Sequence, residues 1–156
     1  MILFGLIFTS VFFLDWVTKF FVRSKLALGS EIPLTSFFSL THVENTGVAF
    51  GFFQGYNHIF LFSGFLIAGF MFWFAYKTYQ EDRITTYFLG MVLGGAMGNL
   101  LDRVMYGRVT DFLHFFVGSW SWPDFNVADA AICTGSILIL IRHFFHIPKN
   151  NSSRDA

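Results

Sequence analysis

The sequence of 156 residues contains little charge and almost no cysteine. Charged residues make up 13% of the chain, about half the share usual in soluble domains. Ten Lys and Arg residues balance ten Asp and Glu residues without forming a basic block, so nucleic acid is not an expected partner. Cys133 is the single cysteine, which excludes an internal disulfide framework and any metal site built from several cysteines. We expect its thiol to be packed inside an apolar helix rather than to act as a nucleophile.

Several sequence motifs of hydrolytic and phosphate-binding sites are also missing. The chain has no His-Glu-x-x-His zinc motif, no Gly-x-Ser-x-Gly turn and no Gly-x-x-x-x-Gly-Lys phosphate loop. Its five histidines are scattered, and His114, three residues beyond Asp111, is expected to be structural. We therefore expect neither a metal nor a cofactor.

Apolar residues are abundant instead. They form 54% of the chain, and phenylalanine alone contributes 24 residues. A small soluble domain has too much surface relative to its volume to bury so many apolar side chains. The composition therefore predicts a membrane protein with lipid as a partner.

Four apolar segments are long enough to cross a bilayer, since 18 helical residues extend about 27 Å. They cover approximately residues 2–22, 59–76, 84–101 and 130–147. The first segment has no basic residue before Lys19 and no small-residue cleavage site after it, so we expect a retained span rather than a cleaved signal peptide.

The segments between these spans, residues 23–57 and 103–126, are predicted to lie together on one side of the membrane. Residues 38–44 alternate with a period of about two and are followed by Asn45-Thr46-Gly47, a pattern typical of a strand or hairpin. Residues 103–126 are expected to form a loop on or in the membrane surface, because they contain two tryptophans. The predicted fold is a single all-α membrane domain, residues 1–156, with four transmembrane helices and a small β-containing extracytoplasmic segment.

Charged residues in membrane segments cost about 2.5–3.5 kcal/mol each on insertion scales, so each one requires an explanation. Asp15 and Lys19 are spaced i, i+4 and share one helix face. Two interpretations remain open for them. They form a structural ion pair with Lys19 reaching outward to the interface, or they position a ligand.

The end of the third span is unusually polar. Asn99 and Asp102 are spaced i, i+3, and Arg103 is adjacent. These residues form either a polar contact that ties the span to its neighbours or the wall of a polar pocket. The preceding run, residues 94–98, contains three glycines and allows another backbone, or an extended peptide, to approach closely.

Asn126 and Asp129 repeat the i, i+3 spacing at the start of the fourth span. Capping of the helix would explain them, but Asp111 lies nearby in the sequence among apolar neighbours. Two carboxyl groups at one depth share a proton, because close like charges raise one pKa. One then activates water as a base while the other protonates the leaving amine, which is the chemistry of an aspartic peptidase.

Two other classes of function fit the sequence less well. A transporter or channel would also place carboxylates in the membrane, but it needs polar residues through the whole bilayer. The second span carries no charge, and the acids gather towards one face. A purely structural scaffold would not require two Asn-x-x-Asp pairs together with an interfacial acid.

Together these residues form a pattern that resembles the bacterial lipoprotein signal peptidases (signal peptidase II). The resemblance covers nearly the whole chain, in the order of the family. It rests on five segments: Asp15–Lys19, Asn45–Phe50, Gly94–Arg103, Gly107–Phe112 and Phe125–Asp129.

The resemblance implies that Asp111 and Asp129 are the catalytic dyad. It also implies a set of supporting residues in the polar site: Asp15, Lys19, Asn45, Asn99, Asp102, Arg103 and Asn126. The implied substrate is a prolipoprotein that carries diacylglycerol on a cysteine, and cleavage just before this cysteine would release the signal peptide. The protein is expected to be a monomer.

The resemblance further implies a location. Ten Lys and Arg residues divide five against five between the two sides, so the positive-inside rule does not choose an orientation. Membership of the family would place the chain in the bacterial inner membrane, with both termini cytoplasmic and the active site near the outer face. Residues 38–53 are expected to cover this site, with Phe52 and Phe53 contacting the substrate.

Overall fold

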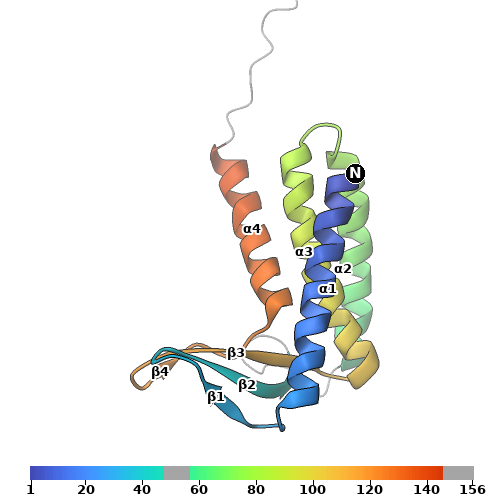
Figure 1. The fold of residues 1–156 in the computed structure, drawn as a ribbon. Coiled ribbons are helices and arrows are strands. Elements are labelled where there is room, and N and C mark those ends of the chain that lie inside the picture. Colours follow the sequence, from blue (N-terminus) through green and yellow to red (C-terminus); the bar gives the residue numbers. More distant parts are fainter. Residues whose placement is uncertain (48–56, 146–156) are drawn as a thin grey trace, which may run out of the picture.

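The computed structural model describes residues 1–47 and 57–145. Its elements follow in the order α1 (Ile2–Lys25), β1 (Glu31–Pro33), β2 (Phe38–Asn45), α2 (Asn57–Thr78), α3 (Arg83–Tyr106), β3 (Val109–Val117), β4 (Trp120–Ser121) and α4 (Val127–Phe145). Within these ranges four helices are long and apolar enough to cross a membrane, which confirms the predicted fold class. The four strands form an antiparallel sheet at one end of the helices, opposite the N-terminus and the end of α4 (Figure 1).

Helix α3 is the centre of the bundle and packs against α1, α2 and α4. More than half of its most apolar stretch is buried, against less than a fifth in each of the other three helices. The outer faces of those helices are therefore covered with large apolar side chains, as lipid requires. The main apolar core lies between α1, α2 and α3 and consists of Phe4, Ala68, Ala75, Leu89, Leu93 and Leu100.

Glycines in α3 allow two neighbouring helices to approach its backbone. A Cβ atom at Gly94 would lie 2.7 Å from the carbonyl oxygen of Phe8 in α1. A Cβ atom at Gly95 would overlap with the carbonyl oxygen of Ala128 in α4. Of the two alternatives for this glycine run, the structure supports the close approach of another backbone, because α1 and α4 occupy the space.

The two ends of α3 have different caps. At its start the Asp82 carboxylate accepts hydrogen bonds from the backbone N–H groups of Ile84 and Thr85, both at 3.1 Å. At its end Gly107 adopts a left-handed conformation with φ of 72°. The helix therefore continues beyond the predicted end of the span at residue 101 and carries Asp102 and Arg103 on its last turns.

The predicted strand at residues 38–44 is confirmed as β2, whereas β3 was not predicted. Residues 103–126 are not the predicted surface loop, because this segment contains the last turn of α3, strand β3 and strand β4. Strand β3 pairs with β2 so that Asp111 lies opposite Val43. The pairing brings β3, which carries Asp111, to one end of the helical bundle (Figure 1). Asp102 of α3 and Asp129 of α4 lie at the same end.

Candidate active site

Strand β3 places Asp111 in a buried position, with only 3% of its surface exposed. Its carboxyl group accepts two hydrogen bonds from side-chain amides. Nδ2 of Asn45 donates to Oδ2 at 3.1 Å, and Nδ2 of Asn126 donates to Oδ1 at 2.8 Å. Asp111 is therefore held from both sides, by β2 and by the segment that leads into α4.

Asp129 lies in the first turn of α4, and Asn126 precedes the helix. The backbone N–H of Asp129 donates to Oδ1 of Asn126 at 3.0 Å, and the backbone N–H of Asn126 donates to Oδ2 of Asp129 at 3.2 Å. This reciprocal pair is a capping box, so the capping interpretation of these residues is correct. The capping also fixes Asp129 at the site, because its other oxygen, Oδ1, accepts a hydrogen bond from Nδ2 of Asn99 at 2.8 Å.

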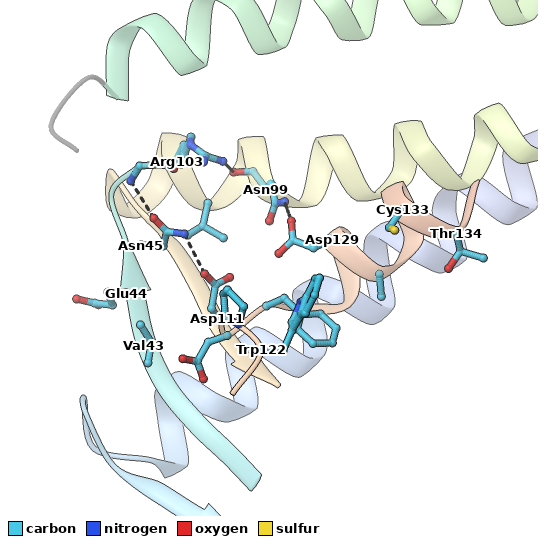
Figure 2. A pocket seen from close by; sticks show the side chains of 16 residues that line it. Val43, Glu44, Asn45, Asn99, Arg103, Asp111, Trp122, Asp129, Cys133 and Thr134 are labelled. Atoms are coloured by element: carbon cyan, nitrogen blue, oxygen red, sulfur yellow. Dashed lines mark hydrogen bonds between the residues drawn. The ribbon is translucent and has the colours of Figure 1, made fainter. Parts of the chain in front are cut away.

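Asn126 connects the two candidate acids. Its backbone contacts Asp129, while its side-chain amide contacts Asp111. Asn126 itself is completely buried. Both acids line the same pocket of about 840 Å³, and Figure 2 shows them facing it from two sides.

The environment of Asp111 changes its ionisation. Burial of the carboxyl group, followed by the nearby charge of Asp129, raises the pKa of Asp111 from 3.8 to about 7. The hydrogen bonds from Asn45 and Asn126 oppose this rise but do not cancel it. A carboxyl group with a pKa near neutrality can carry a proton at the pH of the cell, as a general acid must.

A buried ionic cluster lies next to the two acids. Lys19 forms an ion pair with Asp15 at 2.7 Å and donates a hydrogen bond to Oδ1 of Asn99 at 2.8 Å. Asp15 in turn accepts a hydrogen bond from the backbone N–H of Ala128 at 2.8 Å, in the first turn of α4. The predicted ion pair is present, but the expected outward course of the Lys19 side chain is wrong. Lys19 is completely buried because three polar partners lie inside the bundle.

Asp102 ties α3 to α1 and to β3. Its carboxylate accepts a hydrogen bond from Nη1 of Arg23 at 2.9 Å and another from the backbone N–H of Thr110 at 3.0 Å. Because Thr110 immediately precedes Asp111, this contact fixes the start of the strand at the site. Asp102 therefore forms a polar contact between elements, the first of the two interpretations for this region.

Asn99 and Arg103, by contrast, line the pocket itself, as the second interpretation proposed. Arg103 donates from Nη2 to the carbonyl oxygen of Gly47 at 2.9 Å, which joins α3 to the end of β2. Asn45 closes the same turn, since its Oδ1 accepts a hydrogen bond from the backbone N–H of Gly47 at 2.9 Å. Figure 2 shows Asn45 with its side-chain amide directed at the carboxyl group of Asp111.

The pocket is also lined by residues that were not predicted from the sequence. These residues are Val43, Glu44, Gly47, Val109, Trp122, Pro123, Asp124, Phe125, Ala130, Cys133 and Thr134. The position of Cys133 corrects the earlier expectation of a packed thiol, because this residue is exposed and lies on the pocket wall. Its spacing of four residues from Asp129 could have indicated this, since the two share one helix face.

His114 has a structural environment. Its Nδ1 lies 3.2 Å from Oδ1 of Asp124, and the same oxygen accepts a hydrogen bond from the hydroxyl of Thr41 at 2.6 Å. These contacts join β2, β3 and the segment before α4. Within residues 1–47 and 57–145, no group of three or more His, Cys, Asp or Glu side chains is placed to hold a metal ion. Phe52 and Phe53, which were expected to cover the site, lie outside the described residues.

The chain is similar to proteins of one family along most of its length. The family described as signal peptidase (SPase) II matches residues 7–145. A lipoprotein signal peptidase from Desulforapulum autotrophicum is 40% identical over 147 residues, which cover 90% of this chain and 91% of the relative. A lipoprotein signal peptidase from Pseudoalteromonas atlantica is 41% identical over 138 residues, which cover 86% of this chain and 84% of that relative.

The fold also matches solved structures. A structure of a bacterial membrane enzyme superimposes with a TM-score of 0.85 at 29% sequence identity, covering 90% of this chain and 87% of the other. A second bacterial membrane enzyme gives a TM-score of 0.83 at 28% identity. The match to the family extends over the elements that carry both candidate acids and their amide partners. The chain belongs to the signal peptidase II family.

Proposed function

We propose that this chain is a membrane aspartic endopeptidase that removes the signal peptide from diacylglyceryl-modified prolipoproteins by cleaving before the lipid-modified cysteine. The observation that carries the proposal is the pair of carboxyl groups on one pocket, joined through Asn126 and differing in environment. Membership of the signal peptidase II family supports the substrate class.

In the proposed reaction, Asp111 and Asp129 act on one water molecule and one peptide bond. The carboxylate of the dyad takes a proton from water as the water oxygen attacks the peptide carbonyl. The protonated member gives its proton to the nitrogen as the carbon–nitrogen bond breaks. The products are a signal peptide with a free carboxylate and a lipoprotein with a free amino group. Both acids come from one chain, so we propose that a monomer is sufficient.

The remaining polar residues hold the dyad in place. Asn45, Asn99 and Asn126 donate hydrogen bonds to its four oxygen atoms. Asp15 connects α1 to α4, Lys19 connects α1 to Asn99 of α3, and Asp102 connects α3 to β3. Arg103 stands at the pocket with a guanidinium group, which suits contact with a substrate carbonyl.

A membrane-bound substrate fits the position of the pocket. The pocket lies at the sheet end of the bundle, between β2, β3 and the ends of α3 and α4. We propose that this end faces the outside of the inner membrane and that both termini are cytoplasmic. Trp120 and Trp122 are exposed near the tip of the sheet, where they suit the membrane–water interface. Gathering of the acids at one end also disfavours a conduction path through the bilayer.

Cleavage of a lipid-modified precursor by the purified protein tests the proposal. Asp111→Asn and Asp129→Asn should each reduce kcat by about 10⁴-fold or more, because acid and base act together. Each variant should still fold, as judged by its helical circular dichroism and elution from a sizing column. A metal chelator should leave the wild-type rate unchanged. Substantial turnover in either folded variant would contradict the assignment of the dyad.

A further inference from the structure

The orientation of the Asn99 amide is fixed by a cation. The Lys19 ammonium group can only donate hydrogen bonds, and it lies 2.8 Å from Asn99. The atom that faces it must therefore be the amide oxygen. Nδ2 of Asn126 donates to the same oxygen at 3.2 Å, which supports this orientation independently.

This orientation determines what Asp129 receives. With the oxygen of Asn99 directed at Lys19, the NH₂ group is directed at Oδ1 of Asp129, at 2.8 Å. An NH₂ group only donates, so this oxygen must accept and cannot hold a proton directed at Asn99. Oδ2 of Asp129 accepts the backbone N–H of Asn126, and the residue lies in the first turn of α4, where the helix dipole favours an anion.

Asp111 lies in a different environment. It belongs to a strand, which lacks the dipole of a helix N-terminus. Its oxygens accept hydrogen bonds from neutral amides, as those of Asp129 do, but only 3% of its surface is exposed, whereas Asp129 is half-buried. Burial and the charge of Asp129 raise the pKa of Asp111 to about 7. The two acids are therefore unequal, and Asp111 is the one that keeps a proton more easily.

We propose that Lys19 is a positioning residue that decides which member of the dyad is the base. Through Asn99 it holds Asp129 as the carboxylate that accepts the proton of water, and it leaves Asp111 to supply the proton to the leaving amine. This inference rests on the proposed peptidase function. It assigns one carboxyl group as the base and the other as the acid. Two carboxyl groups in the same environment would not be distinguished in this way.

Lys19, Asn99 and Asp129 form a relay of hydrogen bonds. The charged groups around this relay come from every element packed against it. Helix α1 supplies Asp15 and Arg23 in addition to Lys19, α3 supplies Asp102 and Arg103, β3 supplies Asp111, and α4 supplies Asp129. Asp15 balances the charge of Lys19 at 2.7 Å, while Asp102 lies farther from Lys19, at 3.5 Å. A variant at position 19 therefore leaves Asp15 without its cationic partner and also breaks the relay. The experiment has to separate these two effects.

Two variants separate them. Asp15→Asn removes the charge of Asp15 and leaves Lys19 with Asp102 and Asn99 as partners. Its single side-chain oxygen can accept from the N–H of Ala128 or from Lys19, and not from both. The double variant Asp15→Asn/Lys19→Met then removes the relay without leaving an unpaired buried charge, which would endanger folding. Arg142→Met is a control for lost stability, because it also removes a cation that pairs with an aspartate, Asp82, at the other end of the bundle.

The readout is the pH dependence of kcat for cleavage of a lipid-modified precursor in detergent micelles. Compared with Asp15→Asn, the double variant should have an acidic limb about one pH unit higher, and its kcat should be about 10-fold lower at pH values well below the midpoint of that limb. This shift is the size that loss of one charge-assisted hydrogen bond produces. The limb moves to higher pH because a carboxyl group that has lost a hydrogen-bond donor ionises only at higher pH. Arg142→Met should have a lower Tm but an acidic limb at the wild-type position.

The possible results distinguish this inference from the proposed function. Coincident acidic limbs for Asp15→Asn and the double variant, with both proteins folded, would overturn the role of Lys19 while leaving the dyad intact. Turnover by Asp111→Asn or Asp129→Asn would overturn the peptidase assignment itself. If the double variant does not fold, Asn99→Leu, which removes both the oxygen and the NH₂ group of the relay and leaves the Asp15–Lys19 pair in place, must shift the same limb.

Discussion

Replacement of Asp111 by Asn is expected to stabilise the protein at alkaline pH while it removes the proposed activity. Burial of the carboxyl group and the charge of Asp129 raise the pKa of Asp111 from 3.8 to about 7 in the folded state. The folded protein therefore binds this proton more tightly than the unfolded chain does. The stability that the proton provides is complete below about pH 4 and is lost as the pH rises from about 4 to about 7.

The magnitude follows from the two pKa values. A rise from 3.8 to about 7 corresponds to about 4 kcal/mol, at 1.36 kcal/mol per unit. Asn at position 111 avoids this cost but places an NH₂ group against the amide donor of Asn45 or of Asn126. Asn45 cannot turn freely, because its oxygen accepts the N–H of Gly47. One lost hydrogen bond costs about 1–2 kcal/mol, so the net gain above pH 7 should be about 2–3 kcal/mol.

Thermal unfolding in detergent micelles measures this effect, with tryptophan fluorescence or circular dichroism as the signal. The Tm of the wild type should fall relative to that of Asp111→Asn as the pH is raised from about 4 to about 8. The two proteins should differ most at the alkaline end, where the wild type carries a buried carboxylate. Parallel Tm curves over this range would show that Asp111 ionises in the folded state as it does in the unfolded chain. Such curves would contradict the raised pKa of Asp111.

Two further predictions concern the scaffold. Burial opposes ionisation of Asp82, but its hydrogen bonds from Arg142 and the first turn of α3 lower its pKa to about 2. This pair should therefore contribute stability above about pH 4 that is lost as the pH falls towards 2. Arg142→Met should remove about 1 kcal/mol of it at pH 7, because the site is partly exposed, and an unchanged acid limb of the Tm curve would contradict this. Gly95→Ala should lower Tm by an amount equivalent to about 1–3 kcal/mol, because its Cβ overlaps with the carbonyl oxygen of Ala128. Gly69→Ala is the matched control, since nothing lies within 4 Å of its Cβ, and an equal loss in both variants would exclude the overlap as the cause.

Much of the helical architecture could be predicted because it depends on composition. A run of about 18 apolar residues must be a helix in lipid, since each backbone polar group then finds its partner inside the segment. The ends of the spans were less predictable. Helix α3 continues through Asp102 and Arg103, because their charges are satisfied by α1 and by the end of β2 rather than by water.

Strand β3 shows why part of the fold was missed. A strand with one face in water alternates between apolar and polar residues, as β2 does approximately. Residues 109–112 are all buried, because one face of β3 lines the pocket and the other lies against the ends of the helices. Its sequence therefore has no period of two. Asp111, the acid of this strand, was predicted from its closeness to Asp129 in the sequence and from the resemblance to the family. No predicted strand contributed to this assignment.

The partners of Lys19 could not be predicted from spacing alone. The i, i+4 rule identified Asp15, which lies on the same helix, but Asn99 is 80 residues away in sequence. Its approach depends on the glycines of α3, which bring α1 close enough for a lysine side chain to remain inside. Local patterns predict contacts within a helix, whereas contacts between helices depend on how closely the backbones pack.

The buried ionic cluster is best explained by the precision with which it positions the proposed dyad. Two cations, Lys19 and Arg23, lie with two anions, Asp15 and Asp102, at distances from 2.7 to 3.5 Å, so the cluster carries no net charge. Apolar residues of similar volume usually give equal or greater stability than such buried pairs, so stability alone does not account for it. Each member instead makes a directional contact that apolar side chains cannot make. Asp15 holds the first turn of α4, Asp102 holds the start of β3 at Thr110, and Lys19 orients Asn99. The two carboxyl groups of the proposed dyad come from different elements, and this cluster in the first and third spans fixes both of them.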